Sequence, residues 1–355
     1  MSAIDLARAD IRALKPYSSA RMEASGGSVL LNANESPWPS VMGGTGALNR
    51  YPDPQPAELV KRLAGLYGVA PSQVLVGRGS DEAIDLLVRA FCRAGQDAVV
   101  ISPPTFGMYG VSAGIQDATV IEVPLCADFS LDIDGLLARM TGRVKIVFVC
   151  SPNNPTGKLV PLAMIGQLAA ALTDRALIVV DEAYIEFAGA PSATALLAEY
   201  DNVVVLRTLS KAHALAAARI GTLIADADIV ALLRRILPAY PLPAPCVEAA
   251  LAALTPPALA ATRVRVEGLL RARERLAEVL KTFSGVREVF PSSANFLLVR
   301  CADSNGLYGQ LLAAGVVVRD VSHHAALNDC LRITIGSDED HRRLLAALGL
   351  REEAA

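Results

Sequence analysis

The sequence predicts an α/β fold with a mainly parallel sheet flanked by helices, together with a smaller α+β domain. Short apolar segments alternate with helical ones over residues 57–225, as in parallel sheets that are buried on both faces. Residues 238–245 contain four prolines, which indicates a boundary between structural units. The length of 355 residues also suits two units better than one hydrophobic core.

The elements of the first unit follow from apolar periodicity and from the residues that bound each segment. A helix over 57–67 should end before Gly68, and Ser80-Asp81-Glu82 should open a helix over 80–93. Further helices are predicted over 4–14 and 161–172. The predicted strands are 74–76, 98–102, 119–123, 144–150, 176–180, 203–206 and 220–225.

The remaining segments differ in character from this repeating pattern. Residues 28–56 are rich in proline, glycine and asparagine and should form an irregular arm. Beyond the prolines, a long helix is predicted over about 257–283. Strands over 295–300 and 331–335, with two more helices, should complete the smaller unit.

The composition excludes several classes of protein. The net charge is −3, and no long run of lysine and arginine indicates a nucleic-acid surface. The six cysteines include no C-x-x-C pair, so we expect neither a metal site nor a disulfide framework. No apolar stretch reaches the ~20 residues that a membrane span needs, and charges interrupt the N-terminal segment. We therefore expect a soluble, cytoplasmic protein.

Four predicted strands are each followed by residues that can bind a ligand or take part in catalysis. The four segments are Gly77–Asp81, Ser151–Gly157, Asp181–Tyr184 and Arg207–Lys211. Ligands of open α/β sheets bind at the carboxyl ends of the strands. We therefore expect a carboxylate, an amide, a phenol, a lysine and a helix N-terminus to gather at one edge of the sheet.

These groups match the needs of pyridoxal 5′-phosphate (PLP). The cofactor requires a lysine for its Schiff base and a carboxylate that keeps its pyridine nitrogen protonated. Lys211 directly follows a buried strand, and Asp181 follows another. Asn154 and Tyr184 can both hydrogen-bond the ring hydroxyl of the cofactor. We predict Lys211, Asp181 and Tyr184 as catalytic residues.

A phosphate-binding cup is predicted beside this ring site. Ser80 and Asp81 start a helix, whose free N–H groups and dipole suit a phosphate. The other residues predicted to contact the cofactor are Thr208, Ser210 and Arg219 at the phosphate, and Phe106 on the ring face.

Each feature also has a simpler interpretation when taken alone. An aspartate after a strand is most often a cap or turn residue, and Asn-Asn-Pro-Thr-Gly is a favourable turn. Lys158 is the alternative lysine for the Schiff base. His323 and His324 are interpreted as loop residues, because neighbouring side chains on a strand point to opposite faces and could hardly share one metal. The prediction rests on four strand ends that carry complementary groups.

Longer motifs resemble those of fold-type I aminotransferases, and in detail those of the histidinol-phosphate aminotransferase family. The motifs shared with fold type I are Ser151–Gly157, Asp181–Tyr184 and the pattern Ser-Lys-x-x-x-Leu-Ala-x-x-Arg-x-Gly over 210–221. The closer resemblance lies in residues 15–17, 31–35, 50–52, 78–82, 103–109 and 331–334. It extends from about Tyr17 to the last predicted helix.

This resemblance implies a domain division, an assembly and a reaction. The large PLP-binding domain would span 43–245, and the small domain would combine 1–42 with 246–355. The protein would be a homodimer in which Tyr51 of the partner subunit contacts the cofactor phosphate. The reaction would convert L-histidinol phosphate and 2-oxoglutarate to imidazole acetol phosphate and glutamate, in histidine biosynthesis. The implied substrate contacts are Arg332, Arg319, Tyr17, Asn32 and Tyr240.

Other functions remain open on the same scaffold, namely a phosphothreonine-type decarboxylase and an aromatic amino acid aminotransferase. A PLP-binding regulator would need a DNA-binding domain before Tyr17, and ~16 residues are too few for one. The sequence departs from the family pattern at His213, at Ala217-Ala218 and at Phe106. His213 adds a titratable ring near Lys211, which puts the pH optimum in question.

Overall fold

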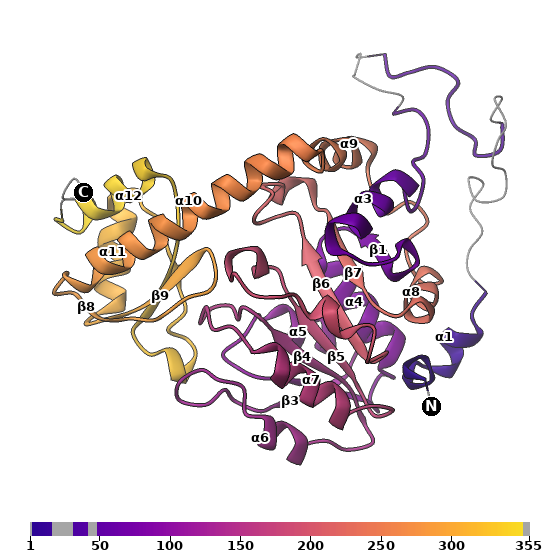
Figure 1. Cartoon of the computed structure of the whole chain (residues 1–355), viewed down its shortest axis with the longest axis horizontal. Coiled ribbons are helices and arrows are strands. Elements are labelled where there is room, and N and C mark those ends of the chain that lie inside the picture. The colour runs from indigo at the N-terminus through magenta and orange to yellow at the C-terminus, as the bar shows by residue number, and fades with distance from the viewer. Residues whose placement is uncertain (1, 16–30, 42–47, 351–355) are drawn as a thin grey trace.

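The computed structural model describes residues 2–15, 31–41 and 48–350. Within them, a seven-stranded sheet and a four-stranded sheet form two units. The long helix α10 (Pro256–Lys281) runs from the large unit to the small one (Figure 1).

The large sheet has the strand order β1-β7-β6-β5-β4-β2-β3. Only β7 runs antiparallel to its neighbours, and the other pairings are parallel, as predicted. The strands are β1 (Val74–Gly77), β2 (Ala98–Ile101), β3 (Thr119–Glu122), β4 (Val144–Cys150), β5 (Leu177–Asp181), β6 (Val203–Thr208) and β7 (Gly221–Ile224). Because β7 alone is reversed, β1, β4, β5 and β6 all end at the same edge of the sheet.

Helices cover both faces of this sheet, which explains why its central strands are apolar throughout. Ile178 and Val180 of β5 pack into one core, whereas Leu177 and Val179 pack into the other. The first core lies under α3 (Ala57–Tyr67), α6 (Ile133–Ala138), α7 (Leu162–Ala171) and α9 (Ala244–Ala253). The second lies under α4 (Ser80–Phe91), α5 (Met108–Ile115) and α8 (Ala227–Arg234).

The boundaries predicted from the sequence agree with the structure at some elements and differ at others. Helix α3 ends where predicted because Gly68 adopts a left-handed conformation with φ of 68°. The predicted helix over 4–14 is instead two short pieces, η1 (Ala3–Leu6) and α1 (Ala9–Ala13). Strand β6 continues to Thr208, beyond its predicted end, because that residue pairs with Gly221 of β7. We did not predict α5, α6, α8 and α9 from the sequence. Helices α6 and α8 do begin after capping aspartates, Asp132 and Asp226, which were a signal that we missed.

The smaller unit is an antiparallel sheet in the order β10-β11-β9-β8. Its strands are β8 (Val286–Val289), β9 (Phe296–Cys301), β10 (Arg319–Asp320) and β11 (Cys330–Thr334). Helices α10, α11 (Ser304–Ala313) and α12 (Asp338–Ala347) bury side chains in one core with β9 and β11. The sequence predicted β9 and β11 but not β8 and β10, which are short and partly exposed.

Packing at two places differs from the expected division into 43–245 and the two terminal segments. Ala3 and Ala7 are buried in the core beneath α4 and α8, so residues 3–7 belong to the large unit. Val247 and Ala250 of α9 are buried in the other core of the large sheet. Both segments present an apolar side that the large unit covers, although they lie outside 43–245.

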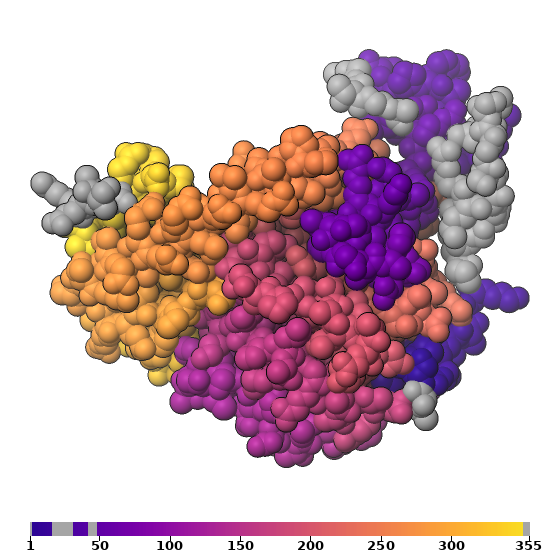
Figure 2. Space-filling view, viewed as in Figure 1, coloured from indigo at the N-terminus to yellow at the C-terminus, as the bar shows by residue number. Residues whose placement is uncertain are grey.

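Residues 31–41 extend away from the body of the molecule, whereas the segment just before α3 returns to it, since Gln55 hydrogen-bonds both backbone groups of Val76 (Figures 1 and 2). Leu31, Trp38 and Val41 expose 90%, 75% and 99% of their surface in the single chain. Among the described residues, no single helix has the length and apolar character to cross a membrane. Helices α9 and α10 have that length and apolar character only when taken together, and a bend of 73° separates them.

Candidate active site

A cavity lies at the edge of the large sheet where β1, β4, β5 and β6 end. The register of the strands brings these ends together, since Cys150 pairs with Asp181, and Thr208 pairs with Gly221. The cavity is lined by Ser80, Asp81, Phe106, Cys150, Asn154, Asp181, Ala183, Tyr184, Thr208, Ser210, Lys211, Ala216 and Arg219. The structure therefore brings together every described residue that we predicted to contact the cofactor, except Tyr51.

Asp181 is the buried acid of this cavity. Its side chain is 3% exposed, and it accepts hydrogen bonds from the Tyr109 hydroxyl at 2.8 Å and from the Ala183 N–H at 3.1 Å. Burial raises the pKa of the carboxyl to about 6, against the opposing effect of the Tyr109 hydrogen bond. A cation beside Asp181 would favour the ionised carboxylate.

Tyr109 is a residue of the site to which the sequence assigned no role. Its ring stacks on Phe148 of β4 with centroids 4.6 Å apart, and its hydroxyl reaches Asp181 from helix α5. A signal was present in the segment 103–109, where two aromatic residues stand three positions apart at the start of α5. The length and the position of that helix became clear only in the structure.

Lys211 follows β6 and opens onto the same cavity. Its Nζ lies 5.6 Å from the centroid of the Tyr184 ring. Burial lowers the pKa of its amine, and the positive charge of Arg332 lowers it further. A larger fraction of the amine is therefore neutral than for a lysine in water. The alternative, Lys158, lies 3.4 Å from Asp128 in an exposed ion pair and does not line the cavity.

The other end of the cavity has the features of an anion cup. Helix α4 begins at Ser80, after Gly79 with φ of 84°, so its first N–H groups face the cup. Ser210 donates its N–H to Thr208 Oγ1 at 3.1 Å, and the two hydroxyls lie 2.9 Å apart. Arg219 Nη2 reaches Asp81 at 3.1 Å. Hydroxyls, a guanidinium and a helix N-terminus therefore converge.

Gly221 allows the backbone of β7 to lie close to the start of α4, beside this cup. A Cβ atom at this position would lie 2.2 Å from the backbone carbon of Gly79 and 2.3 Å from the nitrogen of Ser80. Only glycine allows β7 to approach the start of α4 so closely. The close approach holds the helix N-terminus against the strand ends and leaves space for a phosphate.

Asn154, Tyr184 and Arg332 meet on the side of the cavity that faces the smaller unit. The Asn154 side-chain oxygen accepts a hydrogen bond from Arg332 Nη1 across 178 residues of sequence. Arg332 also lies over the ring of Phe296 at 5.3 Å, and its Nε is buried without a hydrogen-bond partner among the described residues. Strand β11 thus brings a guanidinium with an unused donor to the cavity.

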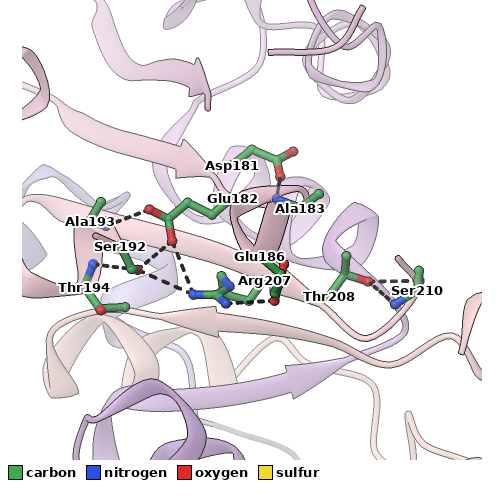
Figure 3. Close-up of polar contacts among 10 residues, drawn as sticks. All are labelled: Asp181, Glu182, Ala183, Glu186, Ser192, Ala193, Thr194, Arg207, Thr208 and Ser210. Carbon is green, nitrogen blue, oxygen red and sulfur yellow. Dashed lines mark hydrogen bonds and ion pairs between the residues drawn. The ribbon is translucent and has the colours of Figure 1, made fainter. Parts of the chain in front are cut away.

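A buried ion network adjoins the ends of β5 and β6 (Figure 3). Arg207 Nη2 lies 2.8 Å from Glu186, and its Nη1 lies 3.4 Å from Glu182. Glu182 also accepts hydrogen bonds from the Ser192 hydroxyl and the Ala193 N–H, both at 2.6 Å. Because Glu182 follows Asp181 and Arg207 precedes Thr208 in β6, the network fixes β5 and β6 beside the cavity.

Three of the described residues that we predicted do not reach the cavity within this chain. Tyr51 and Tyr240 stack on each other, with centroids 4.3 Å apart, and neither lines the cavity. Asn32 also lies outside it. Tyr17 lies outside the described residues. Arg319, in contrast, lines the outer part of the cavity with Arg332.

The cavity fits PLP at both ends. The buried acid suits the pyridine nitrogen, Lys211 faces the space between, and the anion cup suits the phosphate. Among the described residues, no group of three or more His, Cys, Asp or Glu side chains could hold a metal ion. The arrangement therefore defines a PLP-type site on an α/β sheet.

Comparison with known proteins agrees with this class. The family model for aminotransferase class I and II matches residues 28–348. The chain belongs to the class I and II aminotransferase family. Several relatives that share about half of its residues are histidinol-phosphate aminotransferases. It is 53% identical to the histidinol-phosphate aminotransferase of Xanthomonas euvesicatoria, over 99% of this chain and 98% of that protein. It is 52% identical to that of Xylella fastidiosa, over 97% and 96% of the two chains.

Solved structures show the same architecture. The histidinol-phosphate aminotransferase of Sinorhizobium meliloti, in complex with pyridoxal 5′-phosphate, is 29% identical with a TM-score of 0.77, over 84% of this chain and 82% of that chain. The enzyme of Clostridium acetobutylicum has a TM-score of 0.77 at 23% identity, over 85% and 90%, and shares the fold. The predicted fold type, a mainly parallel sheet flanked by helices with a smaller domain, is confirmed.

Proposed function

We propose that the protein transfers the amino group between L-histidinol phosphate and 2-oxoglutarate, giving imidazole acetol phosphate and glutamate, with PLP as its cofactor. The observation that carries the proposal is that Lys211 and Asp181, from the ends of neighbouring strands, face one cavity with an anion cup beside them. The identity of about 53% to histidinol-phosphate aminotransferases supports the substrate. The reaction belongs to histidine biosynthesis.

In this proposal, each residue of the cavity has a defined task at the cofactor. Asp181 would hold the pyridine nitrogen, and Asn154 and Tyr184 would hold the ring hydroxyl. Phe106 would lie against the ring. The start of α4, at Ser80 and Asp81, would hold the phosphate together with Thr208, Ser210 and Arg219. Bound PLP supplies an electron sink for the substrate carbon that loses its proton.

Lys211 moves that proton. Its amine would hold PLP until substrate binds, and would then be free to accept the proton from the substrate carbon and to give it up again as a general acid. The lowered pKa of the amine suits this role, because a base must be neutral to accept a proton. Arg332 and Arg319 bind the phosphate of one substrate and a carboxylate of the other, as a fork of donors can.

We further propose a homodimer in the cytoplasm. The exposed apolar side chains before α3, among them Leu31, Trp38 and Val41, would be covered by the second subunit. The stacked pair Tyr51 and Tyr240 lies outside the cavity of its own chain. Tyr51 of the partner subunit would then contact the cofactor phosphate.

Spectroscopy and kinetics test the proposal together. Purified protein should bind PLP and be yellow, and Lys211→Ala should lose the visible absorbance of lysine-bound cofactor as well as turnover. Lys158→Ala is the matched control and should keep both. Normal transamination by Lys211→Ala would contradict the assignment. Release of carbon dioxide from phosphothreonine, without transamination of histidinol phosphate, would favour the decarboxylase alternative.

A further inference from the structure

The outer part of the cavity is strongly cationic. It is about 510 Å³ in volume and is lined by Lys211, Arg319, Arg332, His323 and His324, with no carboxylate among its lining residues. Arg319 and Arg332 stand directly opposite each other on β10 and β11. Like charges at opposed positions of a sheet are unfavourable unless an anion offsets them. The outer cavity is therefore built to receive an anion.

The two histidines are presented to this cavity by an ordered turn. Asp320 accepts a hydrogen bond from the Ser322 N–H at 2.8 Å, and the His324 carbonyl accepts one from the Leu327 N–H, also at 2.8 Å. Val321 and Leu327, on either side of the histidines, are buried. The turn is anchored at both ends, so the imidazoles are held at the wall of the cavity.

The imidazoles keep donors available for a ligand. Their ring centroids are 4.3 Å apart at an angle of 40°, and neither side chain is hydrogen-bonded to a carboxylate among the described residues. The carboxylates close to them are Glu122 at the end of β3, which acts on His324, and Asp320 at the end of β10, which interacts with His323. Burial and the neighbouring His323 lower the pKa of His324, so an anion would be needed to favour its charged form.

We propose that His323 and His324 donate hydrogen bonds to the phosphate of the amine substrate and so determine the preference for a phosphorylated substrate. This inference rests on the proposed function, because it concerns the same cavity. Arg319 and Arg332 neutralise the anion from the sheet, and the imidazole pair closes the outer side. The pair binds substrate and takes no part in proton transfer, so its loss should raise KM and leave kcat nearly unchanged.

The test compares histidinol phosphate with histidinol, which has the same amine and imidazole but no phosphate. In His323→Ala/His324→Ala, kcat/KM for histidinol phosphate should fall at least about tenfold, equivalent to about 1.4 kcal/mol, because hydrogen bonds to a charged group are lost. The value for histidinol should change less than about twofold. Inorganic phosphate should inhibit the wild type competitively and the double variant more weakly.

Two further variants separate a specific contact from a general effect. His323→Gln/His324→Gln keeps a side-chain N–H donor and should restore part of the lost kcat/KM. Asn328→Ala changes an exposed side chain of the same turn that does not line the cavity, and should match the wild type. Equal losses for histidinol and histidinol phosphate, or no loss, would overturn the inference. If the wild type itself fails to transaminate histidinol phosphate, the proposed function has failed instead.

Discussion

Replacing Asp181 with asparagine should have opposite effects on the protein without cofactor and on cofactor binding. The rise of the carboxyl pKa from 3.8 to about 6 means that burial disfavours the ionised form by about 3 kcal/mol. Asparagine removes this cost, because its oxygen can accept the Ala183 N–H and its amide can donate to the Tyr109 oxygen. Bound PLP, in contrast, loses the anion opposite its pyridine nitrogen.

The sign of the pH dependence follows from the raised pKa. A neutral Asp181 contributes its full stability below about pH 3.8, and that contribution is lost as the pH rises through about 6. PLP-free Asp181→Asn should therefore be more stable than PLP-free wild type at pH 7.5, by up to about 3 kcal/mol, and the difference should shrink towards pH 4. Addition of PLP should raise the melting temperature of the wild type much more than that of the variant.

Urea unfolding of the PLP-free proteins at pH 4.5, 6 and 7.5 measures the first effect, and PLP titration measures the second. Glu182→Gln is a demanding control, because Glu182 is also buried but pairs with Arg207 and accepts two other hydrogen bonds. Burial raises the pKa of Glu182 as well, but glutamine there leaves buried Arg207 with one carboxylate fewer, so that variant should gain less stability at pH 7.5 than Asp181→Asn does. The reasoning about Asp181 is refuted if PLP-free Asp181→Asn is no more stable than wild type at pH 7.5, or if its advantage does not depend on pH.

Three other substitutions test separate parts of the site. Gly221→Ala should weaken PLP binding at least about tenfold in a fluorescence titration, because backbone atoms 2.2 Å from the new Cβ must move. The control Gly166→Ala on α7 should bind PLP normally, because its nearest neighbour lies 3.7 Å from the new Cβ. Arg207→Met should lower the free energy of unfolding by about 3–5 kcal/mol in urea, because it leaves buried Glu182 without its ion-pair partner. The control Arg342→Met removes one side of an exposed ion pair and should cost under about 1 kcal/mol. Arg332→Lys should raise KM for both glutamate and histidinol phosphate about tenfold or more in steady-state assays, because lysine cannot replace the two parallel donors of the guanidinium. An unchanged KM would show that Arg332 does not bind substrate.

Much of the catalytic edge could be predicted from the sequence because parallel strands impose a simple rule. Buried strands are recognisable as apolar runs, and their carboxyl ends meet at one edge. Asp181, Lys211 and the start of α4 at Ser80 could therefore be placed together from their positions after strands. The reversed direction of β7 could not be predicted in this way, because antiparallel and parallel strands have similar apolar patterns.

The tertiary structure alone decided the contacts that depend on residues distant in sequence. Tyr109 hydrogen-bonds Asp181 from a helix that carries no strong sequence signal. Arg207 donates a hydrogen bond to Glu186, which lies 21 residues earlier in the sequence. The opposition of Arg319 and Arg332, and the presence of His323 and His324 at the same cavity, depend on the register of β10 with β11. Periodicity and turn chemistry act over a few residues and so determine elements and strand ends, whereas partners and register follow from how whole elements pack.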